Sequence, residues 1–257
     1  MMHTKRVFQQ ILQKTHMPFY NDGTLVFCTN SKLTRRHFGR KYGLSSPSDY
    51  RPWSLAYADW HQKQVRPIRV DLPEDSVLCN PTFYRENGNI IFSFVAGVPN
   101  EEKLDYHLYR MTGPSWDDLG EAVQAVPEYS RTGFVSPRHC CIGGESYLVL
   151  YDKEKNEWQK LITSLDRIAR AVYDPDRPSQ ILITGLNGLG IFCTLAFDVD
   201  THETRELQGP DSVYKCCLVG NRLVYSYRES PDLEDYQLHV GTANFVDTGE
   251  AVELTLR

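Results

Sequence analysis

Apolar and polar residues alternate along most of this chain, in short runs that end at Gly, Asn, Asp or Pro. A period of two is typical of β-strands with one buried face. Asp22-Gly23 and Asn87-Gly88 each stand between two such runs, and a pair of this kind between two strands predicts a tight hairpin. After residue 14 no stretch of useful length keeps the 3.6-residue period of an amphipathic helix. The pattern therefore predicts an all-β fold.

One β-unit occurs twice along the chain. Its matching pieces are residues 88–94 with 220–227, 105–108 with 235–238, and 120–123 with 249–252. Each copy predicts a strand, a polar loop, a second strand, a turn and a third strand, in that order. A repeated β-unit is the sequence signature of radial or solenoid architectures such as β-propellers.

Five such units can be placed along the chain. Their inner strands are predicted to start near residues 16, 80, 136, 169 and 214, and the third of these strands is predicted over residues 134–138. The mean spacing of about 50 residues lies in the range of propeller blades. We therefore predict one domain over residues 1–257, a five-bladed β-propeller with a short amphipathic helix at about 4–14. A jelly-roll or double-sheet sandwich is the alternative, but it does not explain why the two copies keep their strands in order.

Composition narrows the classes of function. A net charge of −5 gives no general attraction for nucleic acid or anionic membranes. No apolar run is long enough to cross a bilayer, and the first residues lack a signal-peptide core, so we expect a soluble, cytoplasmic protein. The adjacent cysteines at 140–141 and 216–217 would point to opposite faces of a strand, which is not metal-ligand spacing. We expect no metal and no cofactor.

One segment interrupts the strand pattern and reverses the local charge. Residues 31–52, which we call the basic segment, hold seven Lys, Arg and His residues and a single acid, Asp49. The simplest interpretation is a solvated insertion loop. The alternative is a docking surface for a protein partner or a polyanion. The residues predicted to contact that partner are Arg35, Arg36, Arg40 and Lys41.

Short motifs at two predicted strand starts carry a family resemblance. Asn80-Pro81-Thr82-Phe83 and Ser136-Pro137-Arg138 are similar to the Asp-Pro and Glu-Ser-Pro strand starts of five-bladed propeller glycosidases, the arabinanase, β-xylosidase and β-fructosidase kind. The strand at 106–110 that leads to Trp116 also resembles these enzymes. The resemblance covers two or three units and implies the same five-bladed fold.

The same resemblance implies catalytic carboxylates at the axial ends of the inner strands. The matching positions hold Asn80 and Val135, and His16 stands where the first blade would supply another acid. A glycosidase needs two carboxylates across the scissile bond. The pattern therefore departs from the family where catalysis would take place.

The predicted axial mouth offers cations in place of acids. We predict a ligand-binding site there, formed by His16, Asn80, Ser136, Arg138, Arg170 and Lys215. If these side chains converge, they favour an anionic ligand such as a phosphate or a carboxylate, to which arginine gives two parallel hydrogen bonds. A register error of one residue would instead place several of them between blades.

Two classes of function follow from these patterns. The first is a non-catalytic propeller that acts as a binding or assembly module with protein partners, as in a virus or phage particle. Its small ligand would be anionic or a carbohydrate, and we expect neither nucleic acid nor membrane as a partner. The alternative is a glycoside hydrolase-like enzyme with rearranged acids. Its candidates, between which no spacing decides, are Asp22, Glu86, Asp105 and Asp152.

Overall fold

The structure, a computed structural model, describes most of the 257-residue chain. The described residues are 15–29, 54–62, 64–73, 76–100, 103–112, 115–119, 132–207, 213–220, 222–227, 237–242, 247–251 and 255–256. All regular elements within these ranges are β-strands, which confirms the predicted all-β class. The helix expected at about 4–14 and the basic segment lie outside the described residues.

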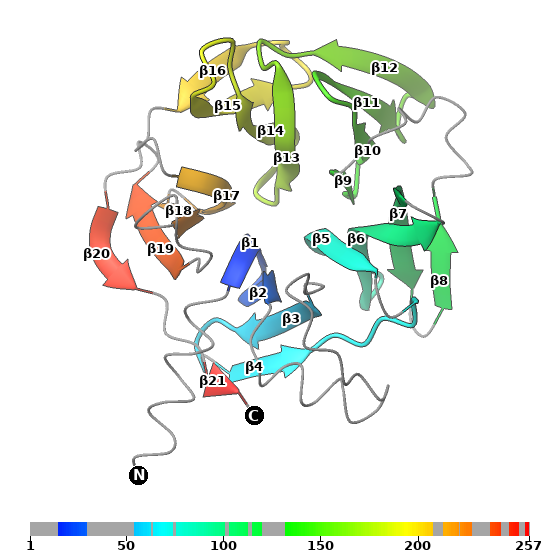
Figure 1. Cartoon of the computed structure of the whole chain (residues 1–257), viewed down its shortest axis with the longest axis vertical. Helices are drawn as coiled ribbons and strands as arrows, with labels where there is room; N and C mark the ends of the chain where they lie inside the picture. The colour runs from blue at the N-terminus through cyan, green and yellow to red at the C-terminus, as the bar shows by residue number, and fades with distance from the viewer. Residues whose placement is uncertain are drawn as a thin grey trace.

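The strands form five sheets around a common axis, as the blades of a propeller (Figure 1). Blade 1 contains β1 (Thr15–Asn21), β2 (Thr24–Thr29), β3 (Ser54–Asp59) and β4 (Gln64–Pro67). Blade 2 contains β5 (Val77–Glu86), β6 (Asn89–Asn100), β7 (Lys103–Thr112) and β8 (Ser115–Asp118). Blade 3 contains β9 (Gly133–Val135), β10 (His139–Gly143), β11 (Tyr147–Asp152) and β12 (Glu157–Ile162).

Two further blades complete the ring. Blade 4 contains β13 (Arg167–Asp174), β14 (Arg177–Leu186), β15 (Phe192–Asp198) and β16 (Thr204–Leu207). Blade 5 contains β17 (Val213–Val219), β18 (Arg222–Tyr227), β19 (Gln237–Thr242) and β20 (Asp247–Ala251). In every blade the first strand lies nearest the axis, and the next three follow outward in sequence order. The predicted five-bladed propeller is therefore confirmed.

The end of the chain joins blade 5 back to blade 1. Strand β21 (Thr255–Leu256) pairs in parallel with β4, with Thr255 opposite Gln64 and Leu256 opposite Val65. Figure 1 shows β21 beside β4 on the outer side of blade 1. A strand added at this position closes the ring and covers the outer edge of that sheet.

The repeated sequences occupy equivalent strands. The first two pieces of the earlier copy overlap β6 and β7 of blade 2, and those of the later copy overlap β18 and β19 of blade 5. These are the second and third strands of their sheets, as predicted. Residues 120–123 of the third piece lie outside the described residues, so the equivalence of that piece stays a prediction.

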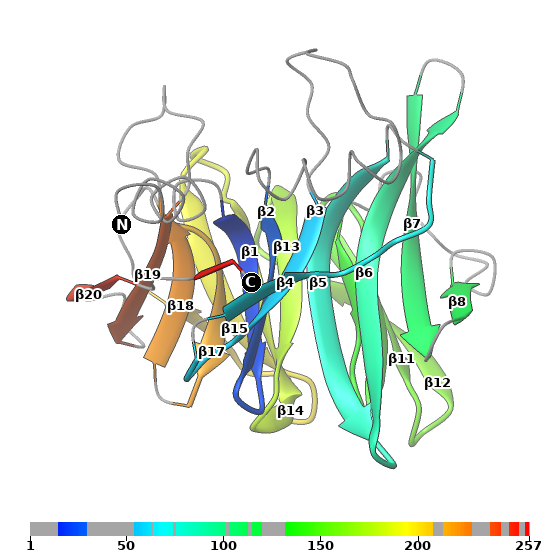
Figure 2. The same ribbon diagram turned by 90° about the horizontal axis from the view of Figure 1, so that it is seen from below.

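The inner strands β1, β5, β9, β13 and β17 all run in the same direction. They begin on one face of the ring, which we call the upper face, and end on the opposite, lower face (Figure 2). Two predicted hairpins lie on the lower face. Asp22 and Gly23 have φ of 44° and 71°, and Asn87 and Gly88 have φ of 51° and 78°. Positive φ at both central residues matches the twist of the flanking strands.

Blade 3 differs from the expectation at its inner strand. We predicted a strand over 134–138, but β9 ends at Val135 and residues 136–138 form the turn to β10. The Ser136 N–H donates to the carbonyl oxygen of His139 at 2.8 Å, and the His139 N–H donates to Ser136 Oγ at 2.8 Å. Pro137 has no N–H for a strand ladder, so the chain reverses here. Ser136 and Arg138 consequently lie on the lower face.

The described part of the chain contains no helix that is long and apolar enough to cross a membrane. It also contains no group of three or more His, Cys, Asp or Glu side chains arranged to hold a metal ion.

Candidate functional site: a buried arginine on the propeller axis

Four of the five inner strands are bulged close to the upper face. The pairing register shifts between His16 and Phe19 in β1, and between Cys79 and Thr82 in β5. The register also shifts between Ile168 and Arg170 in β13, and between Tyr214 and Cys216 in β17. Bulges bend a strand and redirect its side chains, and they are frequent beside functional sites. The shared level of these bulges marks one zone around the axis.

Two of the bulges contain the same unusual backbone. Met17 and Asn80 each precede a proline, and their φ angles are 54° and 51°. Left-handed backbone in a residue other than glycine costs about 1–3 kcal/mol and persists only where neighbours hold it. The Asn80 N–H donates to Met17 Sδ at 3.1 Å, and the Met17 N–H donates to Ser226 Oγ at 3.1 Å. These contacts join blades 1, 2 and 5.

Asn80 is buried and hydrogen-bonds in three directions. Its side-chain amide donates to the carbonyl oxygens of Gly133 and Ala171, the second at 3.0 Å. Its Oδ1 accepts from Arg170 Nε at 2.9 Å. An aspartate at this position would turn an oxygen toward the two carbonyl groups, which repel it. The amide therefore suits this position because it both donates and accepts.

Arg170 lies at the centre of this zone and is 1% exposed. Its two hydrogen-bond acceptors among the described residues are neutral, Asn80 Oδ1 and the carbonyl oxygen of Pro18, the latter at 2.7 Å from Nη2. Its Nη1 is buried and has no hydrogen-bond partner in the described ranges. Burial lowers the pKa of Arg170 from its ordinary value, but a guanidinium stays protonated in proteins. We call Arg170, Asn80 and the Pro18 carbonyl the axial centre.

The groups around the axial centre do not neutralise it. The thiols of Cys28, Cys79, Cys216 and Cys217 lie near enough to Arg170 to act on its charge. Burial raises the pKa of Cys217 to about 12, although Arg170 opposes this shift. Burial likewise raises the pKa of Cys216. These two thiols are therefore uncharged at neutral pH, and the charge of Arg170 has no counter-ion among them.

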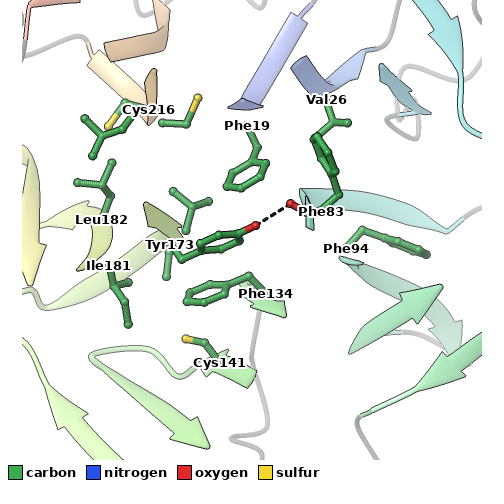
Figure 3. Packing of buried hydrophobic residues seen from close by; sticks show 14 of the residues in the cluster. Phe19, Val26, Phe83, Phe94, Phe134, Cys141, Tyr173, Ile181, Leu182 and Cys216 are labelled. Carbon is green, nitrogen blue, oxygen red and sulfur yellow. Dashed lines mark hydrogen bonds between the residues drawn. The ribbon is translucent and has the colours of Figure 1, made fainter. Parts of the chain in front are cut away.

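Aromatic side chains fill the axis below Arg170. Phe19, Phe134 and Tyr173 come from the inner strands of blades 1, 3 and 4, and each is at most 1% exposed. Ring centroids lie 5.1 Å apart for Phe19 and Tyr173 and 5.7 Å for Phe134 and Tyr173. The Tyr173 hydroxyl donates to the Phe83 carbonyl at 2.6 Å (Figure 3). This aromatic floor closes the axis between Arg170 and the lower face.

The structure brings together two of the six predicted ligand-binding residues, Asn80 and Arg170. Ser136 and Arg138 lie on the lower face, where Arg138 Nη2 bonds Asp152 Oδ2 at 3.1 Å and Asp200 carboxylate oxygens lie within reach of both Nη atoms. The backbones of His16 and Lys215 belong to bulged strands, and their side chains lie outside the described part. Ligand binding by the six residues stays a prediction.

The sequence analysis missed several parts of the axial centre. Thr132 Oγ1 accepts from the Ala171 N–H at 2.8 Å and fixes the strand that carries Arg170. Met17 and the aromatic floor were also missed. One signal was available for Met17, because Met17-Pro18 and Asn80-Pro81 recur at the same place in two units. Nothing local marks Thr132, which stands outside any strand pattern.

The alternative catalytic acids do not meet at the axial centre. Asp22 Oδ2 accepts from Arg85 Nε at 2.8 Å, and Asp152 binds Arg138, both on the lower face. Glu86 ends β5 on that face. Asp105 lies on β7, the third strand of blade 2, and accepts from the Asn100 side chain.

Solved structures with a similar fold are related to this chain only distantly. TolB from Acinetobacter baumannii has a TM-score of 0.55 and 12% sequence identity, over 91% of this chain and 53% of that one. The putative TolB from Agrobacterium tumefaciens has a TM-score of 0.50 and 11% identity, over 93% and 80%. A sialidase from Trypanosoma rangeli has a TM-score of 0.45 and 9% identity, over 91% and 47%.

These likenesses concern the fold alone, since the identities are low. This chain spans about half the length of the Acinetobacter TolB chain (53%). No protein-family model matches the sequence, and no curated protein sequence matches it. The fold and its neighbours together show that the chain is a five-bladed member of the β-propeller proteins.

Proposed function

We propose that this chain is a non-catalytic binding module whose upper face takes up an acidic group of a protein partner. One observation carries the proposal. Arg170 is fully buried on the axis, and within the described part of the chain its hydrogen-bond acceptors are neutral and its Nη1 has no partner. A buried charge is costly unless it is paired and hydrogen-bonded. A carboxylate at Nη1 would supply both the counter-charge and the missing hydrogen bond.

The surroundings of Arg170 support a strong interaction with such a group. The aromatic floor excludes water from below, and electrostatic interactions are stronger in a medium of low dielectric constant. Asn80 and Pro18 hold the guanidinium in place before any ligand arrives. A site that is already organised loses less conformational entropy on binding.

The basic segment extends the same proposal to the surface. Thr29 at the end of β2 pairs with both Thr15 and Ser54. The end of β2 and the start of β3, between which the basic segment lies in the sequence, are therefore level with the start of β1. This is the upper face. We propose that Arg35, Arg36, Arg40 and Lys41 contact the acidic partner there, while Arg170 binds one of its carboxylates.

The inner strands favour binding over glycoside hydrolysis. Their only acids are Glu86 and Asp174, at the lower ends of β5 and β13. A glycosidase needs two carboxylates on either side of the scissile bond, and none stands in the inner strands beside Arg170. Assembly into a larger particle, as expected for a viral subunit, and a cytoplasmic location stay predictions.

Thermal unfolding in different anions tests the axial centre. Sodium acetate at constant ionic strength should raise the melting temperature of the wild type more than that of an Arg170→Met variant. A ligand that binds only the folded state stabilises it by about 2.7 kcal/mol at a hundredfold excess over Kd. Effects of acetate that do not involve the site should change the melting temperatures of the wild type and the variant equally. Equal responses of the two proteins would refute the proposal.

A second measurement tests the basic segment. Arg35, Arg36, Arg40 and Lys41 are changed together to Ser, and binding of a poly-glutamate peptide is followed by calorimetry. The variant should bind more weakly, and the wild-type affinity should fall with salt because exposed charges are screened over about 8 Å. Tighter binding of an oligonucleotide than of poly-glutamate would contradict a protein partner.

A further inference from the structure

A second site lies between blades 1 and 2, away from the axial centre. A cavity of about 300 Å³ separates the facing sides of these two sheets. Blade 2 lines it with Phe83, Phe92 and Met111, which stand side by side because Phe92 pairs with both of the other two residues. Volumes of this size lie at the lower end of the range of small-molecule sites. We call it the inter-blade cavity.

The wall that blade 1 contributes is different. Val26 is opposite Tyr57 in the sheet, and Thr24 lies two residues before Val26 on the same strand. Figure 3 shows the side chains of Val26 and Phe83 pointing toward one another across the interface. The cavity therefore has a mostly aromatic wall on the blade 2 side. On the blade 1 side, two hydroxyl-bearing residues stand beside the aliphatic side chains of Val26 and Ile68.

Thr24 and Tyr57 also line a neighbouring polar pocket of about 230 Å³. Its other lining residues are Asp59, Gln62, Gln64 and Arg66. Gln64 Oε1 is buried there, and no described residue donates a hydrogen bond to it. A buried acceptor of this kind needs a donor, because leaving it unpaired is unfavourable. The observation points to a ligand that brings a hydroxyl or N–H group.

The charges of the two pockets are balanced. Asp59 and Arg66 carry opposite charges in the polar pocket. Arg85, which lines the inter-blade cavity, forms an ion pair of 2.8 Å with Asp22. A balanced lining gives no net attraction for an ion, so an uncharged ligand suits it better than a phosphate or a fatty acid.

We propose that these adjoining pockets bind an uncharged molecule in which an aromatic ring is joined to a polyhydroxylated group. The ring lies in the inter-blade cavity against Phe83, Phe92 and Met111. The hydroxyl groups reach the polar pocket, where one donates to Gln64 Oε1 and others bond Asp59 and Arg66. Aryl glycosides and nucleosides share this chemistry.

Methyl NMR of methionine-labelled protein tests the site in the wild-type chain. Of the four methionines, Met111 lines the inter-blade cavity and Met17 lies beside the axial centre. Phenyl β-glucoside and adenosine are titrated separately, with phenol and glucose as the two halves of the first probe. One of the two compounds should shift the Met111 methyl signal in a saturable way and leave Met17 unchanged. A Met111→Leu variant assigns the signal.

The affinities decide whether both pockets take part. The active compound should bind about tenfold or more tightly than either half, because each tenfold gain needs only about 1.4 kcal/mol. No shift of Met111 with either compound, or equal shifts at Met17, would overturn the proposal. If glucose binds as tightly as phenyl β-glucoside, the aromatic ring does not contribute to binding, and that part of the proposal is wrong.

A Gln64→Leu variant tests the buried acceptor. It should weaken binding of the active compound about tenfold, a loss typical of one well-placed hydrogen bond, and leave the shift caused by phenol unchanged. Gln159→Leu is the matched control, because Gln159 lies on the fourth strand of blade 3 as Gln64 lies on the fourth strand of blade 1. Equal affinities in wild type and Gln64→Leu would contradict the role of Gln64.

Discussion

Arg170 on the axis and Arg138 on the lower face are the same kind of side chain in opposite surroundings. Arg138 is 14% exposed and lies within 4 Å of three carboxylates, those of Asp152, Asp200 and Glu154. Arg170 is more deeply buried, yet the groups it bonds are a side-chain amide and a backbone carbonyl. The protein neutralises the more accessible charge itself, whereas the deeper charge has no acidic hydrogen-bond partner among the described residues.

The pKa shifts on the lower face reflect the structural role of Arg138. Its hydrogen bonds hold the pKa of Asp200 below the usual range. Burial opposes the same effect at Asp152, but the backbone N–H groups of Lys155 and Glu154, together with Arg138, still lower the pKa of that carboxyl. Since Asp152 belongs to blade 3 and Asp200 follows β15 of blade 4, Arg138 joins two blades.

Removal of Asn80 should have the largest effect, because it breaks the axial centre. Asn80→Ala leaves Arg170 Nε and two buried carbonyl groups without their partners. Each unsatisfied buried group costs about 1–3 kcal/mol, so we expect the free energy of unfolding to fall by about 3 kcal/mol or more. Urea denaturation measures it. Asn21→Ala is the control, since Asn21 donates one bond to the Phe83 carbonyl and should lose about 1 kcal/mol.

Matched substitutions of the two arginines test the comparison directly. Arg138→Met should lower the free energy of unfolding by about 2 kcal/mol, because Asp152 is 4% exposed and loses one of its charged partners. Arg170→Met should change it by less than about 1 kcal/mol, because removal of an uncompensated buried charge offsets two lost hydrogen bonds. Chemical denaturation of both variants is the measurement. A larger loss for Arg170→Met would make Arg170 a structural residue.

The pH dependence of stability should show the smallest effect. His139 is fully buried beside Arg138, with Nε2 3.7 Å from Asp152 Oδ2 and Asp200 close by. Burial, and then the charge of Arg138, lower the pKa of His139. The unfolded chain therefore binds this proton at higher pH than the native state. The stability that depends on neutral His139 is fully present above about pH 6.5. Below that pH the free energy of unfolding falls by at most about 1.4 kcal/mol per pH unit.

Denaturation at pH 7.5 and 5.5 measures that fall. Since the pKa of Asp152 and that of Asp200 lie below their usual range, the stability that these carboxylates add is lost only below about pH 4. His139→Gln should reduce the difference between the two pH values by about 1 kcal/mol. An unchanged difference in the variant would assign the effect to the other histidines.

Much of the fold could be predicted because its signals are local. Asx-Gly pairs set two hairpins, and alternation of apolar residues set most strands. The strand predicted over 134–138 was wrong for an equally local reason, since Pro137 and the Ser136–His139 bonds reverse the chain after Val135. As a result Arg138, predicted for the axial mouth, lies on the other face among carboxylates.

The sequence by itself determined the class of fold, the number of blades and the strand order, because a repeated pattern and turn residues act over short distances. Only the tertiary structure decided which polar groups meet. Asn80 and Arg170 are 90 residues apart, and Pro18 lies 152 residues from Arg170. Closure of the ring brings their bulged strands to one axis, where the aromatic floor removes water. Whether a cation is paired or left free depends on that closure, which no single segment of the sequence encodes.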